Sequence, residues 1–285
     1  MKMKVYGFDN IFLIIDEGGG IMEDYFGCTW IAPSTGEEGS MNVQVTVAVP
    51  GGHSSLHLAA TFPPVLSPMN PFSAFAQCLA LHGPIDDELR RALASEWTWG
   101  DVARIMAGRD AGDWARLSTT QAVDIVSGGV KVNALPEEAH VVVNHRVSAD
   151  FSLQAIQDRY VRLLTPEAAR FNLKVVSFGE DVPVGATRYV RLTALSGAEA
   201  SPVTPAEGSA WEHLVGTDTI AAPYLSTGGT DTRSYVNLTR AIFRFQAVRD
   251  AAERVGIHTV DERVHVNGHM HAIDVDQTPH SSASL

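Results

Sequence analysis

Residues 11–20, IFLIIDEGGG, restrict the possible folds more than any other stretch, because five apolar residues lead directly into two carboxylates and three glycines. Such an apolar run is typical of a strand buried on both faces, as in the parallel sheet of an α/β protein. Asp16 and Glu17 should then lie at the carboxyl end of the strand, where open α/β sheets collect ligands. The glycines would let the chain turn sharply beside a bound group.

Two interpretations of Asp16 follow from this position. Its carboxylate could bind a metal ion, or it could belong to a solvated strand-to-loop turn, where Asp and Gly are common. Strand side chains alternate between faces, so Asp16 and Glu17 point to opposite sides. At most one of them faces a site directly.

A second strand is predicted at residues 41–49, MNVQVTVAV, where apolar and polar residues alternate. This period of two indicates one buried and one wet face, as in an antiparallel sheet. Helical patterns lie at 85–97, 99–106 and 111–117, and a longer amphipathic helix is predicted at 150–164. Strands and helices therefore share this part of the chain.

Domain boundaries are predicted where the composition changes. The chain becomes mixed and polar before residue 38, and a stretch rich in Gly, Pro, Ser and Ala begins after residue 178. We expect residues 1–37 and 181–285 to form one α/β domain. Residues 38–180 should form a smaller α+β domain inserted into it.

Composition excludes several classes of partner. The chain has 285 residues, 45% of them apolar, and a net charge of −12, which disfavours nucleic acid and anionic membranes as partners. No apolar run reaches the roughly 18 residues of a membrane span, and the first residues lack a small-residue cleavage site. A soluble chain is expected, with no indication of its compartment. Cys28 and Cys78 suggest two isolated thiols, although a disulfide between them remains open.

Two glycine-rich stretches hold candidate functional residues. His53 in PGGHSS could donate a hydrogen bond to a developing oxyanion or a carboxylate, or it could be a turn histidine beside a serine cap. In STGGTDTRSY, residues 226–235, the planar guanidinium of Arg233 suits a bidentate grip on a carboxylate. The alternative is that Asp231 and Arg233 pair to stabilise their own loop.

Further candidates lie in a hairpin-like region and in the C-terminal part. Asn133 precedes a proline turn and Arg146 lies on the returning strand, where both could also be solvated. His258 follows two apolar residues in a loop and is the best candidate metal ligand among the C-terminal histidines. The other histidines are interpreted as surface residues: His265, His269 and His271.

Taken together, six stretches resemble the di-zinc aminoacylase / carboxypeptidase S / glutamate carboxypeptidase family, and its carboxypeptidase S branch in particular: IIDEGGG, PGGHSS, SGGVKVNALPE, NHRV, TGGTDTRSY and IHTVDERV. They occur in the family's order over nearly the whole chain. The resemblance implies a zinc-binding α/β domain interrupted by a lid domain that forms a homodimer. It also implies a metallopeptidase that hydrolyses the amide bond of N-acyl amino acids or small peptides with a free C-terminal carboxylate, using two zinc ions.

The resemblance assigns roles to individual residues. Asp16 would bind one zinc ion and His258 the other, and His53 would reach from the lid into the partner subunit's site to stabilise the tetrahedral intermediate. Four residues would hold the substrate carboxylate and carbonyl: Asn133, Arg146, Gly229 and Arg233.

The sequence departs from the family at its start. The family's His-x-Asp motif, bridging aspartate and Glu-Glu pair all precede the DEGGG strand, and MKMKVYGFDNIFLII contains none of them. A catalytic zinc needs about three protein ligands. We therefore expect a copy that lacks the N-terminal part of the catalytic domain, binds zinc weakly and hydrolyses substrate barely or not at all. The alternatives are a non-catalytic dimerising fragment that retains the lid, and a half-protein completed by a separate chain.

Overall fold

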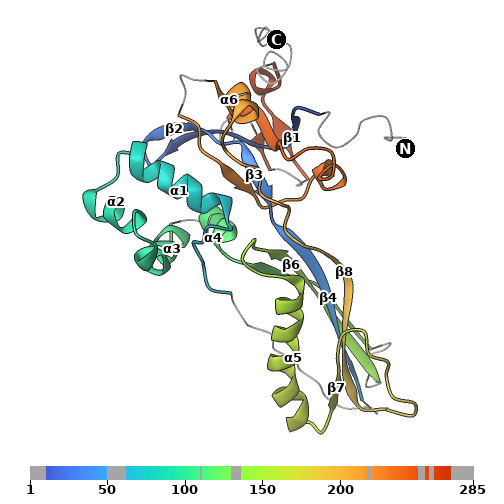
Figure 1. Cartoon of the computed structure of the whole chain (residues 1–285). Coiled ribbons are helices and arrows are strands. Elements are labelled where there is room, and N and C mark those ends of the chain that lie inside the picture. Colours follow the sequence, from blue (N-terminus) through green and yellow to red (C-terminus); the bar gives the residue numbers. More distant parts are fainter. Residues whose placement is uncertain are drawn as a thin grey trace. The chain divides into compact units, whose positions relative to one another are not determined.

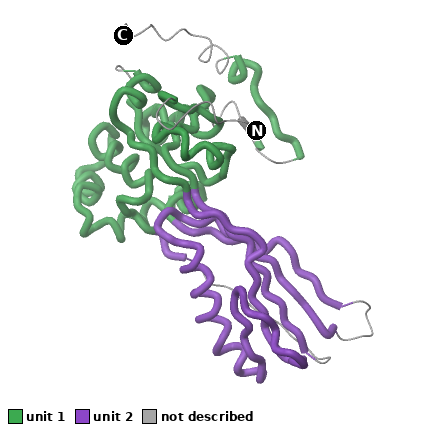
Figure 2. The backbone as a smooth tube through the Cα atoms, turned by 45° about the vertical axis from the view of Figure 1, so that its right-hand side comes forward, with its two compact units in different colours: residues 1–37, 65–117, 201–285 green, residues 38–64, 118–200 purple. Residues whose placement is uncertain are grey.

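The structure is a computed structural model that describes residues 11–49, 62–109, 111–129, 136–216, 220–249, 254–256 and 260–270. The fold is mixed α/β, as the sequence predicts, and its two larger sheets have five strands each. The chain folds into two compact units (Figure 2). Unit 1 comprises residues 1–37, 65–117 and 201–285, and unit 2 comprises residues 38–64 and 118–200.

This division differs from the expected domain ranges in two places. The sequence places residues 65–117 in the inserted domain, but their helices pack on the sheet of unit 1. It places residues 181–200 in the outer domain, but they contain a strand that pairs with the central strand of unit 2. Only the change after residue 37 coincides with an expected boundary.

The sheet of unit 1 has the order β2-β1-β10-β3-β9. Its central pair is parallel and joins β1 to β10, with Ile14 opposite Ile242 and Asp16 opposite Arg244. β3 is antiparallel to β10 and parallel to β9. The strands are β1 (Ile14–Tyr25), β2 (Cys28–Ile31), β3 (Ser34–Glu37), β9 (Tyr224–Ser226) and β10 (Ile242–Arg249).

The first strand corrects two expectations. β1 does not end at Asp16 and Glu17 but continues through the glycines to Tyr25. It is also not buried on both faces, since Ile15 is 46% exposed. The glycines permit close approach within the sheet: a Cβ added to Gly19 would lie 2.1 Å from the carbonyl oxygen of Ala32, and the register with β10 shifts there.

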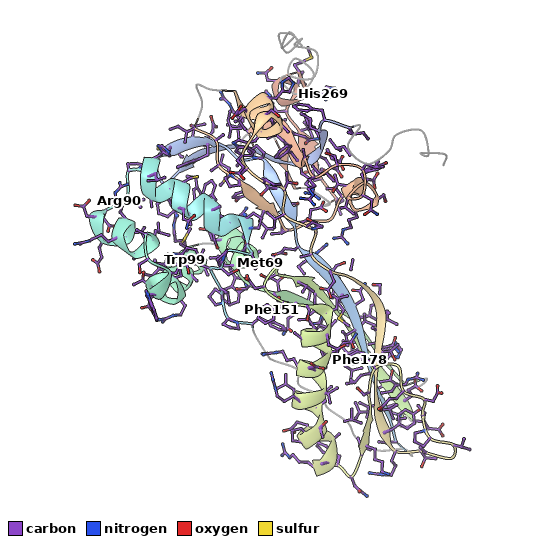
Figure 3. The ribbon with its side chains drawn as sticks, in the orientation of Figure 1. Met69, Arg90, Trp99, Phe151, Phe178 and His269 are labelled. Carbon is purple, nitrogen blue, oxygen red and sulfur yellow. The ribbon has the colours of Figure 1, made fainter. Side chains whose placement is uncertain are left out.

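Four helices of unit 1, α1–α4, gather in one group, and α6 lies apart from them (Figure 1). α1 packs on the sheet through Phe75, whose ring lies 5.2 Å from Trp30 and 5.3 Å from Tyr224 between centroids. Arg90 donates to Gly83 O at 3.0 Å and closes the α1–α2 turn (Figure 3). The helical elements are α1 (Pro71–His82), α2 (Asp87–Leu93), η1 (Glu96–Thr98), α3 (Trp99–Ala107), α4 (Ala111–Leu117), α6 (Ser209–Val215) and η2 (Asp231–Ser234).

Unit 2 is an antiparallel sheet with one parallel edge pair, in the order β5-β6-β4-β8-β7. α5 lies along this sheet (Figure 1), and Phe151 and Phe178 lie beside it (Figure 3). The alternation predicted for residues 41–49 is confirmed from Met41 to Val45, whereas Thr46, on the face expected to be wet, is fully buried. The elements are β4 (Gly39–Ala48), β5 (Thr120–Gly128), β6 (Glu138–Val147), α5 (Leu153–Arg170), β7 (Lys174–Val176) and β8 (Tyr189–Ala198).

β11 (Arg254–Val255) and β12 (Arg263–Val264) pair as an antiparallel two-stranded sheet. His265 and His269 are exposed, as expected for surface histidines, whereas His271 lies outside the described residues. Within the described ranges, no helix combines the length and hydropathy needed to cross a bilayer.

The core of unit 2 contains a fully buried histidine. His145 Nδ1 lies 3.3 Å from Met41 O and Nε2 lies 3.3 Å from Tyr160 Oη. Burial lowers the pKa of His145, although backbone hydrogen bonds to Met41 and Val143 oppose the shift. The folded pKa is therefore below that of the unfolded chain, which binds the proton more readily as the pH falls.

We expect unit 2 to lose stability as the pH drops below about 6.5, the ordinary pKa of histidine, because protons then favour the unfolded chain. Protection factors for amide hydrogen exchange in α5, which divide out the intrinsic pH dependence of exchange, measure this loss between pH 7.5 and 5. His145→Gln should remove most of the pH dependence, and His140→Gln on the same strand should keep it. Equal slopes in the two variants would contradict the assignment.

Candidate functional site

A buried arginine organises the centre of unit 1. Arg244 lies inside the apolar strand β10 and is 1% exposed, a position where an unpaired charge would be very unfavourable. Its Nη2 donates to Oε2 of Glu37 at 3.1 Å, and Glu37 is also 1% exposed. Burial lowers the pKa of Arg244, whereas the carboxylates of Glu37 and Asp16 act in the opposite direction. The ion pair joins the middle of β10 to the end of β3.

The loop after β9 is attached to the same pair. Thr230 N donates to Glu37 Oε1 at 2.7 Å, and the Thr232 hydroxyl donates to Glu37 Oε2 at 3.3 Å. Arg244 donates to Thr232 Oγ1 from Nε at 3.0 Å and from Nη2 at 2.7 Å. The TGGTDTR loop is therefore fixed to the sheet through Glu37 and Arg244.

Arg233 lies at the edge of this network. Its Nε is 3.9 Å from Glu37 Oε2, and its side chain is 32% exposed. The guanidinium lies over Gly229, because a Cβ added there would meet Nη2 at 2.3 Å and Cζ at 2.7 Å. A glycine at this position therefore allows the planar group to lie against the backbone.

Asp16 on β1 is paired with Arg244 on β10, and β1 and β3 lie on opposite sides of β10 in the sheet. Asp16 Oδ1 accepts from Glu17 N at 2.9 Å, and the buried Oδ2 has no hydrogen-bond partner among the described residues. A buried carboxylate oxygen of this kind fits a metal ligand. The part of the chain that the structure describes holds no group of three or more His, Cys, Asp or Glu suited to a metal ion. Asp16 thus fits one ligand position, and the described residues do not complete a metal site.

The structure brings together three of the residues singled out in the sequence. Asp16, Gly229 and Arg233 all border the Glu37–Arg244 pair in unit 1. Arg146 is exposed on β6 in unit 2, opposite Ser40 and Thr120. The remaining candidates, His53, Asn133 and His258, lie outside the described residues.

Sequence reasoning missed Glu37 and Arg244, which hold the site together. A signal for Arg244 was present, because a charge inside the apolar run AIFRF requires a buried partner. Glu37 is half of an adjacent acid pair in a segment that looked like a polar linker. Nothing local in the sequence pairs the two, which are 207 positions apart.

The geometry defines a class of site. A guanidinium that is partly exposed, lies on a glycine and is held by a buried carboxylate can present parallel N–H donors to an anion. The Asp16 carboxylate lies beyond Arg244 in the same sheet. In unit 1, the Arg233 guanidinium and the Asp16 carboxylate thus lie on either side of the buried Glu37–Arg244 pair.

Comparisons with known proteins agree with the resemblance inferred from the motifs. An uncharacterized carboxypeptidase of Schizosaccharomyces pombe is 32% identical over 305 residues, covering 94% of this chain and 50% of the relative. Carboxypeptidase S of Saccharomyces cerevisiae is 30% identical over 308 residues, covering 94% of this chain and 53% of the relative. Human N-fatty-acyl-amino acid synthase/hydrolase PM20D1 is 25% identical over 284 residues, covering 90% and 52%.

The chain is therefore homologous to carboxypeptidase S and PM20D1 over most of its own length, and it spans about half the length of these relatives. No family model matches it. Among solved structures, the M20 family metallo-carboxypeptidase Sso-CP2 from Sulfolobus solfataricus is 13% identical with a TM-score of 0.47, covering 90% of this chain and 60% of that chain.

Proposed function

We propose that this chain contributes the substrate-carboxylate side of a metallopeptidase or amidohydrolase of carboxypeptidase S type. The substrate would be an N-acyl amino acid or small peptide with a free C-terminal carboxylate. The observation that carries the proposal is the position of Arg233, which lies over Gly229 beside the buried Glu37–Arg244 pair. The names of the homologues support the reaction class.

The reaction would proceed at a zinc centre to which Asp16 and His258 each contribute one ligand. Bound zinc would polarise the amide carbonyl and activate water. Arg233 and Gly229 would hold and orient the substrate carboxylate, together with Asn133 and Arg146, and His53 would stabilise the oxyanion. These last three assignments, like that of His258, rest on the motif resemblance.

We also propose that unit 2 is the lid and forms a homodimer. Its edge strand β5 pairs with β6 on one side and exposes apolar side chains, with Val123, Ile125 and Val126 each more than half exposed. Exposed apolar edge strands favour pairing with another strand. This observation equally favours the alternative of a non-catalytic dimerising fragment. Sedimentation velocity tests the dimer, and a monomer at micromolar concentration would count against it.

Ligand binding tests the carboxylate proposal without requiring turnover. The purified chain should bind N-acetyl-leucine but not N-acetyl-leucinamide, since the amide lacks the anionic group. Arg233→Ala should weaken binding roughly 10- to 100-fold, the range expected for loss of a charge-assisted hydrogen bond of about 1.5–3 kcal/mol. Chemical-shift changes on titration measure the affinity.

Arg240→Ala is the matched control, because Arg240 is exposed in the same unit. It should bind like the unaltered chain. Equal affinity of the unaltered chain for the acid and the amide would contradict the proposal, as would unchanged binding in Arg233→Ala.

A further inference from the structure

The loop that carries Arg233, residues 226–235, is called the Arg233 loop below. Three of its groups lie against the carboxylate of Glu37, the last residue of β3. Glu37 Oε1 accepts from Thr230 N at 2.7 Å. Glu37 Oε2 accepts from the Thr232 hydroxyl at 3.3 Å and lies 3.9 Å from Arg233 Nε. A backbone amide, a hydroxyl and a guanidinium of the same loop thus converge on one buried side chain.

We propose that Glu37 and Arg244 are positioning residues that hold Arg233 ready for the substrate carboxylate. This proposal rests on the proposed function for the ligand that Arg233 binds. Neither Glu37 nor Arg244 touches that ligand, because both are 1% exposed. They act through the loop that carries Arg233.

The charges explain why a buried acid is needed here. Burial is the main cause that lowers the pKa of Arg244, and the positive charge of Arg233 lowers it further. Glu37 Oε2 lies 3.1 Å from Arg244 Nη2 and 3.9 Å from Arg233 Nε, so it is the counter-ion of both. Without this carboxylate, the fixed charge of Arg244 would repel Arg233 away from the sheet.

The strand pairing explains why Glu37 reaches the loop. Glu37 is the last residue of β3 and lies opposite Ser226, the last residue of β9. The loop begins directly after Ser226, whose hydroxyl also accepts from Gly228 N at 3.3 Å. A glycine-containing loop loses much conformational entropy when it is ordered. Contacts that order the loop before binding improve affinity without touching the ligand.

A matched control separates positioning from ordinary structural support. Asp113 is a second fully buried acid of unit 1, and it accepts from the Tyr25 hydroxyl at 2.9 Å and pairs with Arg116 at 3.5 Å. These two partners lie on β1 and α4, outside the Arg233 loop. Asp113→Asn should destabilise unit 1 and leave the Arg233 loop unchanged.

The experiment compares amide hydrogen exchange in residues 226–235 among the unaltered chain, Glu37→Gln, Thr232→Val and Asp113→Asn. Glu37→Gln places an amide donor against the Arg244 guanidinium, and Thr232→Val removes the hydroxyl while keeping the side-chain shape. Both should increase exchange in the loop at least about 10-fold, the signature of a local opening. Both should also weaken binding of N-acetyl-leucine, and Glu37→Asp should restore part of it.

The outcomes are distinct. Loop exchange that stays at the unaltered level in both Glu37→Gln and Thr232→Val overturns the proposal, as does equal opening in Asp113→Asn. If Glu37→Gln does not fold, Thr232→Val decides alone. If the unaltered chain binds no carboxylate, the proposed function fails, whereas the exchange comparison still decides whether Glu37 and Arg244 position the loop.

Discussion

Arg244→Met should lower the free energy of unfolding of unit 1 by about 3–5 kcal/mol, the usual cost of removing one partner of a buried ion pair. The substitution keeps an unbranched apolar stem at this position but leaves the Glu37 carboxylate buried without its Arg244 counter-charge. It also removes the Nε and Nη2 groups that donate hydrogen bonds to Thr232 Oγ1. Urea denaturation followed by tryptophan fluorescence measures the loss, because all five tryptophans of the chain lie in unit 1.

Two variants control this measurement. Arg240→Met removes an exposed arginine and should change stability by less than about 0.5 kcal/mol. The double variant Glu37→Gln/Arg244→Met leaves neither charge of the pair buried alone and should regain part of the loss, while the introduced glutamine still accepts from Thr230 N. A loss below about 1 kcal/mol in Arg244→Met would show that the pair contributes little.

Patterns that reflect local burial were predictable from the sequence. The alternation at residues 41–49 identified β4, since every second residue of a strand points to the same face and the valines on that face contact the core. The apolar stripe at 150–164 identified α5, although the helix continues past Pro166 to Arg170. The order of the six motifs predicted the carboxypeptidase S branch, and carboxypeptidase S of Saccharomyces cerevisiae is 30% identical over 94% of this chain.

Elements that depend on distant partners were not predictable. β8 contains Ser, Gly and Ala and resembles a linker, but it pairs with β4, more than 140 positions earlier in the chain. α1 was hidden by the prolines before it, although Asn70 caps the helix and Pro71 occupies its first turn. The Glu37–Arg244 pair joins two strands that only the folded sheet brings together.

A substitution at Gly229 separates an effect on ligand binding from an effect on the stability of unit 1. Gly229 lies outside the left-handed region, so alanine is compatible with its backbone. The added Cβ would nevertheless lie 2.3 Å from Nη2 of Arg233. Because that atom is the far end of a flexible side chain, the guanidinium can move aside at little cost to the fold. Gly229→Ala should therefore displace Arg233 from its position beside Glu37 without unfolding unit 1.

We expect Gly229→Ala to weaken binding of N-acetyl-leucine at least about 10-fold, which corresponds to about 1.4 kcal/mol. Its free energy of unfolding should change by less than about 1 kcal/mol, since Glu37 loses only the 3.9 Å contact with Arg233 and keeps its closer partner Arg244 at 3.1 Å. Gly228→Ala is the matched control, because a Cβ there would meet only Ser226 Oγ at 4.0 Å among the described residues. It should bind like the unaltered chain. Unaltered binding in Gly229→Ala would mean that the guanidinium need not lie on the glycine, and the geometric argument for a carboxylate site at Arg233 would then fail.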